Sequence, residues 1–176
     1  MLYTRKGDDG TTKCFGCDQR ISKSSAVTEA LGCLDEVNSF LGVVKTQKAA
    51  GKVVIEAVGD IQENLFIIQA EIAGADKKIE DLEVVKIEGY IKAIEEELPP
   101  IKTFFVSGGT ELAAMLDFAR TLARRAERRV VAVSEEGKVK VGVNTLAYLN
   151  RLSSLLYALA RLSNHLSGIN EQSPKY

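Results

Sequence analysis

The sequence predicts an all-α protein, an antiparallel bundle of five helices. Five long segments carry apolar residues at alternating steps of three and four, the spacing that gives a helix one apolar face. Glycine or proline interrupts the chain between these segments. The connections are short, so consecutive helices are expected to run in opposite directions, with almost no strand.

Composition limits the classes of function. The 176 residues are expected to form a single domain, 1–176, and the hydrophobic fraction of 45% is ordinary for a globular protein. The net charge is −1, but basic residues gather in residues 1–23 while residues 76–97 are mostly acidic, so a local basic pocket remains possible. The chain has no Trp and few aromatic residues, which argues against a base-stacking nucleic-acid surface. No apolar run approaches about 18 residues and no signal peptide is visible, so we expect a cytoplasmic protein without a membrane partner.

Residues 1–25 are predicted to form a loop that could hold phosphate. Glycines allow close approach to the backbone, threonines offer hydroxyl groups, and lysines offer ammonium groups. The residues concerned are Thr4, Lys6, Gly7, Gly10, Thr11, Thr12 and Lys13. The spacing is not that of a Walker loop, and a simple turn or a frayed end is the alternative.

Cys14 and Cys17 form a C-x-x-C pair without the second pair that a zinc site needs. Cys33 and the single histidine, His165, lie elsewhere in the sequence. A redox pair or half of a metal site stays open beside incidental thiols. We therefore assign no metal ligands.

The first helix is expected from Ala26 to about Lys48, with Ser24 or Ser25 as its N-cap. Asp35 falls at the edge of the inner face, where its carboxylate either needs a cation or is simply exposed beside Glu36.

The second helix is expected from about Val53 to Ala73 and the third from about Asp81 to Leu98, where two prolines follow. Residues 101–109 form a short apolar connection. If it is extended, Phe104 and Phe105 point to opposite sides, so that at least one should be buried and the other could line a pocket.

The fourth helix is expected to start after the N-cap Thr110 and to end near Ser134. Its apolar seam consists of Leu116, Ala119, Ala123, Ala126, Val130 and Val133. The stretch Arg120–Arg129 holds five arginines, and Arg120, Arg124 and Glu127 lie beside the seam. Guanidinium groups on a close-packed helix suit a polyanion, although a solvated face with intrahelical ion pairs is the alternative. A further face, formed by Arg129, Phe118 and Leu122, suits a partner helix or subunit.

The fifth helix is expected from about Asn144 to Leu166. Its apolar side carries Leu149, Leu152, Leu156, Leu159 and Leu166. A polar stripe of Asn150, Ser154, Tyr157 and Arg161 faces either water or a ligand groove against the arginine-rich helix. The tail Glu171–Tyr176 is expected to be loose. The bundle has no E-x-x-H pair, so di-iron chemistry is not expected.

Four stretches, in chain order, resemble one family, the propanediol-utilisation type of ATP:cob(I)alamin adenosyltransferase. They are Tyr-Thr-Arg-Lys-Gly-Asp-Asp-Gly-Thr-Thr at 3–12, the segment Ala30–Asn38, Arg-Arg-Ala-Glu-Arg-Arg within Arg120–Arg129, and Leu-Asn-Arg-Leu-Ser at 149–153. The resemblance implies a ferritin-like, cobalamin adenosyltransferase-like bundle with the ATP-binding loop at 1–25 and the helices at 26–167. It also implies a homotrimer with active sites between adjacent subunits.

The same resemblance implies roles for individual residues. The ATP triphosphate would be bound by Thr4, Arg5, Lys6, Gly7, Thr12, Lys13 and Lys23. From the neighbouring subunit the site would be completed by Arg124, Glu127, Arg128 and Asn150. Arg120 would pair with Asp35 between subunits, and Phe104 would pack beneath the corrin and keep cobalt without a lower ligand. The catalytic candidates are thus Arg124, Arg120, Asp35 and Phe104. Ser154 and Tyr157 depart from the family pattern, which often has Asp and Phe there.

The implied reaction transfers the 5′-deoxyadenosyl group of ATP to the cobalt of cob(I)alamin or a corrinoid precursor, giving adenosylcobalamin and triphosphate. Cobalt(I) is itself the nucleophile, so the protein needs no His or Cys constellation. It must orient two substrates and stabilise the leaving triphosphate, with Mg²⁺ bound through the phosphates. A reductase and an adenosylcobalamin-dependent enzyme are the implied partners. The alternatives are a helical ATP-binding regulator without chemistry and a structural bundle whose arginines form subunit salt bridges.

Overall fold

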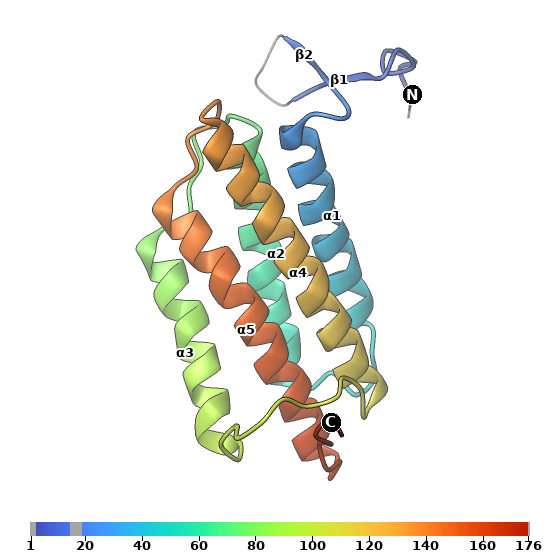
Figure 1. The fold of residues 1–176 in the computed structure, drawn as a ribbon, viewed down its shortest axis with the longest axis vertical. Helices are drawn as coiled ribbons and strands as arrows, with labels where there is room; N and C mark the ends of the chain where they lie inside the picture. The colour runs from blue at the N-terminus through green and yellow to red at the C-terminus, as the bar shows by residue number, and fades with distance from the viewer. Residues whose placement is uncertain (1–2, 15–18, 176) are drawn as a thin grey trace.

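The computed structural model describes residues 3–14 and 19–175, and it confirms five antiparallel helices (Figure 1). The helices are α1 (Ala26–Lys45), α2 (Lys52–Ile72), α3 (Asp81–Glu97), α4 (Glu111–Glu136) and α5 (Val143–Leu166). Helix α4 packs against α1 and α5, while α5 also packs against α3 and α1 against α2. No helix in the described part of the chain is both long and apolar enough to cross a membrane.

The apolar seam predicted on α4 forms the centre of the core. Each of its six residues, from Leu116 to Val133, is at most 1% exposed. Three of them are alanines, whose small side chains let α1 and α5 approach the α4 backbone closely. On α5, the predicted apolar residues are buried except Leu166, which is 70% exposed. That assignment was wrong, and Leu166 is the last residue of the helix, where the packing against the bundle ends.

Side chains cap the helices where the sequence predicts them. Ser25 is the N-cap of α1, and Thr110 Oγ1 accepts a hydrogen bond from the Ala113 amide at 3.1 Å at the start of α4. Helix α4 runs two residues beyond the predicted end and stops at Gly137, whose φ of 70° is the left-handed conformation that glycine adopts readily.

Helix α5 is capped from another helix. Its N-cap, Gly142, has no side chain, and the carboxylate of Glu71 on α2 takes that place. Glu71 is 4% exposed. Its oxygens accept hydrogen bonds from the Gly142 amide at 2.7 Å and from the Thr145 hydroxyl. A carboxylate at a helix N-terminus satisfies amides that the helix itself leaves unbonded.

Two predictions about the chain ends were wrong. Residues 1–25, predicted as a loop, contain an antiparallel hairpin of β1 (Thr11–Lys13) and β2 (Arg20–Ser22), with Thr12 opposite Ile21. The tail from Glu171, predicted to be loose, is attached to the bundle through Glu171 and through the Gln172 carbonyl, which accepts from the Val106 amide at 2.8 Å. Backbone pairing orders the hairpin, and Arg161 and the Val106 amide attach the tail; a search for helical periodicity detects neither.

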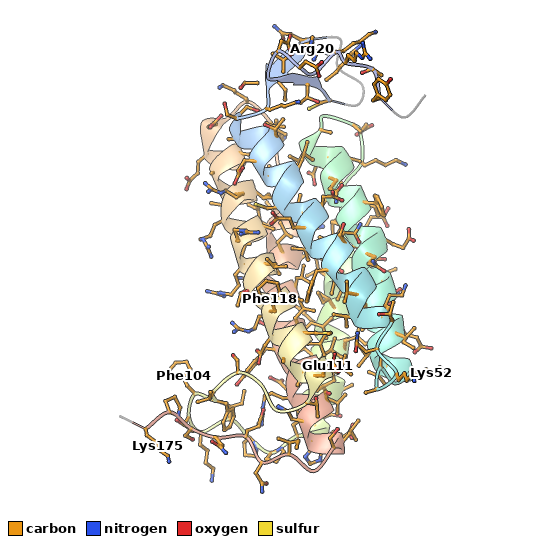
Figure 2. The ribbon with its side chains drawn as sticks, turned by 90° about the vertical axis from the view of Figure 1, so that its right-hand side faces the viewer. Arg20, Lys52, Phe104, Glu111, Phe118 and Lys175 are labelled. Atoms are coloured by element: carbon orange, nitrogen blue, oxygen red, sulfur yellow. The ribbon has the colours of Figure 1, made fainter. Side chains whose placement is uncertain are left out.

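The hairpin and the connection between α3 and α4 lie at opposite ends of the bundle. Figure 2 shows Arg20 of the hairpin at one end of the long axis and Phe104 of the connection at the other. Helices α4 and α5 span the distance between them (Figure 1).

We expect Glu71→Ala to lower the free energy of unfolding by about 2–4 kcal/mol, because it leaves the half-buried Gly142 amide and the buried Thr145 hydroxyl without their acceptor. Chemical denaturation measures this loss. Glu63→Ala is the matched control, since Glu63 is an exposed glutamate on the same helix. Equal stability of the two variants would contradict the capping role.

Candidate functional site

One group of predicted site residues lines a pocket of about 560 Å³ between α4, α5 and the α3–α4 connection. Phe104 lies on one wall and is 78% exposed. Arg120 and Arg124 of α4 line the same pocket, together with Ser154 and Tyr157 of α5. The polar stripe predicted on α5 therefore faces a groove against the arginine-rich helix at these two positions.

Arg120 is held by two neighbours that the sequence analysis did not assign. Its Nε donates to Asp117 Oδ1 at 3.2 Å, and its guanidinium carbon lies 6.0 Å from the centre of the Tyr157 ring. Asp117 is only 9% exposed, so this anchor is sheltered from water. Burial raises the pKa of the Tyr157 hydroxyl, which keeps the ring neutral beside the arginine. The spacing of three residues between Asp117 and Arg120 is a sequence signal that could have identified the pair.

Arg124 is exposed at the pocket wall. Beyond it along the helix, Asn150 Nδ2 donates to Glu127 Oε1 at 3.0 Å, and Arg128 Nη1 donates to the Arg124 carbonyl at 3.0 Å. Glu127 thus bonds across to α5 and does not form the intrahelical ion pair considered from the sequence. The four residues Arg124, Glu127, Arg128 and Asn150 form one continuous group on the α4 and α5 surfaces.

The prediction that Phe104 or Phe105 would be buried in the core was wrong. Phe104 is exposed and Phe105 is half-buried. The connection crosses the end of the bundle and does not enter it (Figure 1). Phe105 packs against the guanidinium of Arg161, whose carbon lies 5.2 Å from the ring centre.

At the other end of the molecule, Arg20 and Lys23 shape the N-terminal turn. Arg20 donates to the carbonyls of Lys6 and Thr11 and, through Nε at 2.6 Å, to the Thr11 hydroxyl. Lys23 Nζ donates to the Gly7 carbonyl at 2.8 Å. Hydrogen bonds from Thr11 lower the pKa of Asp9, which keeps its carboxylate charged beside Arg20.

The geometry of this turn explains its glycine. A Cβ on Gly7 would lie 3.2 Å from the Thr11 carbonyl oxygen and 3.1 Å from Lys23 Nζ. Arg5 adopts a φ of 59°, and Thr4 Oγ1 is 3.4 Å from the Lys6 amide nitrogen. The side chains of Thr4, Arg5 and Lys6 are exposed on this turn.

A second pocket, of about 630 Å³, lies where the hairpin meets α1 and α2. It brings together Thr12, Lys13 and Asp35 with Phe66, an exposed aromatic residue that the sequence analysis did not identify. Phe66 lies off the buried seam of its helix, about 100° from Leu65, and this spacing is a sequence signal that could have identified its exposure. Cys14 also lines this pocket, whereas Cys17 lies outside the described residues.

The single chain divides the predicted site residues between these two places. Phe104, Arg120 and Arg124 line the pocket on α4 and α5, whereas Thr12, Lys13 and Asp35 line the pocket on α1 and α2. The remaining N-terminal candidates belong to the hairpin end, far from Phe104 (Figure 2). Asp35 and Arg120 do not pair within the chain, since Arg120 bonds to Asp117.

The model of the cobalamin adenosyltransferase family matches residues 2–163. The chain is 40% identical over 173 residues to corrinoid adenosyltransferase PduO of Citrobacter freundii, covering 93% of this chain and 50% of that protein. It is 37% identical over 177 residues to the corrinoid adenosyltransferase of Bacillus subtilis, covering 97% of this chain and 90% of that protein. The chain thus spans about half the length of the Citrobacter relative.

Solved structures resemble the chain over nearly its full length. One is a PduO-type ATP:corrinoid adenosyltransferase from Lactobacillus reuteri, with one phenylalanine changed to histidine, in complex with cobalamin and ATP. It superposes with a TM-score of 0.91 at 30% identity, covering 99% of this chain and 97% of that one. An arginine-to-lysine variant of that Lactobacillus enzyme, in complex with ATP, gives a TM-score of 0.89 at 29% identity and covers 99% of this chain and 100% of that one.

Proposed function

This chain belongs to the cobalamin adenosyltransferase family, and we propose that it transfers the 5′-deoxyadenosyl group of ATP to the cobalt of a reduced corrinoid. The observation that carries the proposal is the α4–α5 pocket, which is lined by an exposed phenylalanine and two arginines. An apolar ring suits the face of a macrocycle, and guanidinium groups suit phosphate oxygens.

The reaction needs orientation and charge stabilisation from the protein. The electron pair of cobalt(I) forms the bond to C5′ of ATP, the C5′–O bond breaks, and triphosphate leaves with the electron pair of that bond. Negative charge grows on the departing oxygen, and arginine and lysine side chains already in position stabilise it without reorganisation. No side chain has to act as a nucleophile or as a base.

We assign ATP binding to the N-terminal turn, through Thr4, Arg5, Lys6, Gly7, Thr12 and Lys13. The hydrogen bonds from Arg20 and Lys23 support this assignment, because they shape the turn before ATP arrives and leave the Lys6 side chain exposed. Lys23 then acts mainly through the Gly7 carbonyl.

Magnesium would enter bound to the triphosphate. Within residues 3–14 and 19–175, no group of three or more His, Cys, Asp or Glu side chains could hold a metal ion. The oxygens of the triphosphate are the hard ligands that Mg²⁺ prefers.

The active site is assembled between subunits of a homotrimer. The two groups of site residues line separate pockets on different helices of one chain, which supports a site that two neighbouring chains complete together. Asp117 anchors Arg120 through Nε, which leaves the terminal nitrogens of that arginine for Asp35 of the neighbouring subunit. The enzyme would work in the cytoplasm with a reductase that supplies cobalt(I) and an enzyme that uses adenosylcobalamin.

Arg124→Ala is expected to lower kcat by about 100-fold or more, on the order of 3 kcal/mol, because it removes charge stabilisation from the leaving triphosphate. An anaerobic assay with ATP, Mg²⁺ and chemically reduced cobalamin measures the rate from the spectrum of the alkylated product. The matched control is Arg129→Ala, which removes an exposed arginine of the same helix that pairs with Glu29 of α1. Near-normal kcat for the Arg124 variant would rule out its role.

Mixed trimers test whether the site is shared. Lys6→Ala and Arg124→Ala chains, each inactive alone, are co-expressed with different tags. In randomly assembled trimers, about one quarter of the subunit contacts join a chain with an intact Lys6 to a chain with an intact Arg124. About one quarter of the wild-type rate should therefore return. If Lys6 and Arg124 of the same chain formed the site, the mixture would stay inactive.

Phe104→Ala is expected to lower kcat about tenfold or more while the KM for ATP changes little, because the ring acts on the cobalt side. The electron paramagnetic resonance spectrum of bound cobalt(II) should lose the species without a lower ligand. Phe104→Leu, which keeps apolar bulk, should retain part of that species. An effect confined to the KM for ATP would contradict the assignment.

A further inference from the structure

The connection that carries Phe104 is attached to the bundle by Arg161 of α5. Arg161 is 6% exposed, although arginine is rarely buried without partners. Its Nε donates to Glu171 at 2.9 and 3.2 Å, and its Nη2 donates to the Pro99 carbonyl at 3.1 Å. Its guanidinium also packs against the Phe105 ring. One side chain thus joins α5, the start of the connection and the C-terminal segment.

Further contacts attach the other end of the connection. Asn164 Oδ1 accepts from the Thr110 amide at 3.0 Å, and Asn164 Nδ2 donates to the Gly108 carbonyl at 2.9 Å. Within the connection, the Val106 amide donates to the Gln172 carbonyl at 2.8 Å. Asn164 is also buried, at 7% exposed.

These attachments lie on both sides of Phe104 and leave the ring exposed. The connection forms neither helix nor strand between Pro99 and Thr110, so its backbone gains no rigidity from regular hydrogen bonds. A ring that must fit beneath a macrocycle needs a backbone held to a fraction of an ångström. The buried contacts of Arg161 supply that restraint.

We propose that Arg161 and Glu171 are positioning residues for the step at cobalt: their ion pair clamps the C-terminal segment and the connection together and so fixes Phe104. This inference rests on the proposed function. The ion pair does not touch the ATP turn of its own chain, which lies at the opposite end of the molecule, so its loss is expected to act on cobalt through Phe104 (Figure 2).

Glu171→Gln is the central variant, because it removes the charge and keeps the shape of the side chain. Its matched control is Glu88→Gln. Glu88 accepts from Nε of Arg151, also on α5, at 3.0 Å, but this pair is more exposed and joins α5 to α3. Each variant removes the charge of one carboxylate that accepts a hydrogen bond from an arginine of α5. Only Glu171→Gln touches the clamp.

Glu171→Gln is expected to lower kcat about tenfold and to reduce the fraction of bound cobalt(II) without a lower ligand, while the KM for ATP stays within about twofold. Glu88→Gln should match the wild type in all three quantities. Arg161→Lys keeps the charge but cannot reach Glu171, Pro99 and Phe105 together, so it should reproduce the loss of the cobalt(II) species if Glu171→Gln fails to fold. A wild-type cobalt(II) spectrum and kcat in a folded clamp variant would overturn the proposal.

Hydrogen exchange separates this inference from the proposed function. Amides of residues 99–110 should exchange faster in Glu171→Gln than in Glu88→Gln without any substrate present. If the wild-type protein alkylates no corrinoid, the proposed function fails, whatever the exchange shows. If the wild type is active and exchange in residues 99–110 is unchanged in Glu171→Gln, only the clamp is refuted.

Discussion

The close packing of α4 against α1 and α5 is the constraint on which the rest of the structure depends. Alanines at 119, 123 and 126 leave no gap for a larger side chain, so the helix has a single rotational setting in the core. That setting divides the arginines between two sides. Arg125 and Arg129 pair with Glu36 and Glu29 of α1, whereas the arginines on the opposite side face the pocket with α5. Among the described residues, the arginines on this side have no carboxylate partner on a neighbouring helix, so their guanidinium groups are available to bind a phosphate.

Irregular backbone at both ends of the bundle is organised by arginine in the same way. Arg20 holds two carbonyl groups of the N-terminal turn, and Arg161 holds the Pro99 carbonyl together with Glu171. The guanidinium group donates in several directions within one plane, so it can join segments that have no regular hydrogen bonding of their own. The helices provide distance and rigidity between the two ends. The two arginines provide local shape where the proposed substrates bind.

Much of the fold and part of the site were predictable from the sequence, for an identifiable reason. A helix satisfies its own backbone hydrogen bonds, so its existence and buried face follow from local spacing. The α4 seam and the caps at Ser25 and Thr110 were found in this way. The sequence did not decide whether the polar stripe of α5 faces water or a groove, because Ser154, Tyr157 and Arg161 lie on one stripe in either case. The packed structure separates them: two line the pocket and Arg161 is buried.

The sequence by itself determined the five helices, the caps at Ser25 and Thr110 and the seam that orients α4, and its motifs pointed to the family. Only the tertiary structure decided which polar groups meet. Glu71 caps α5 through the Gly142 amide, 71 residues further along the chain, and Arg161 reaches back 62 residues to the Pro99 carbonyl. Phe104 is exposed and its neighbour half-buried because the connection crosses the end of the bundle. Such partners depend on how whole helices are placed relative to one another. The spacing of residues along one segment does not predict that placement.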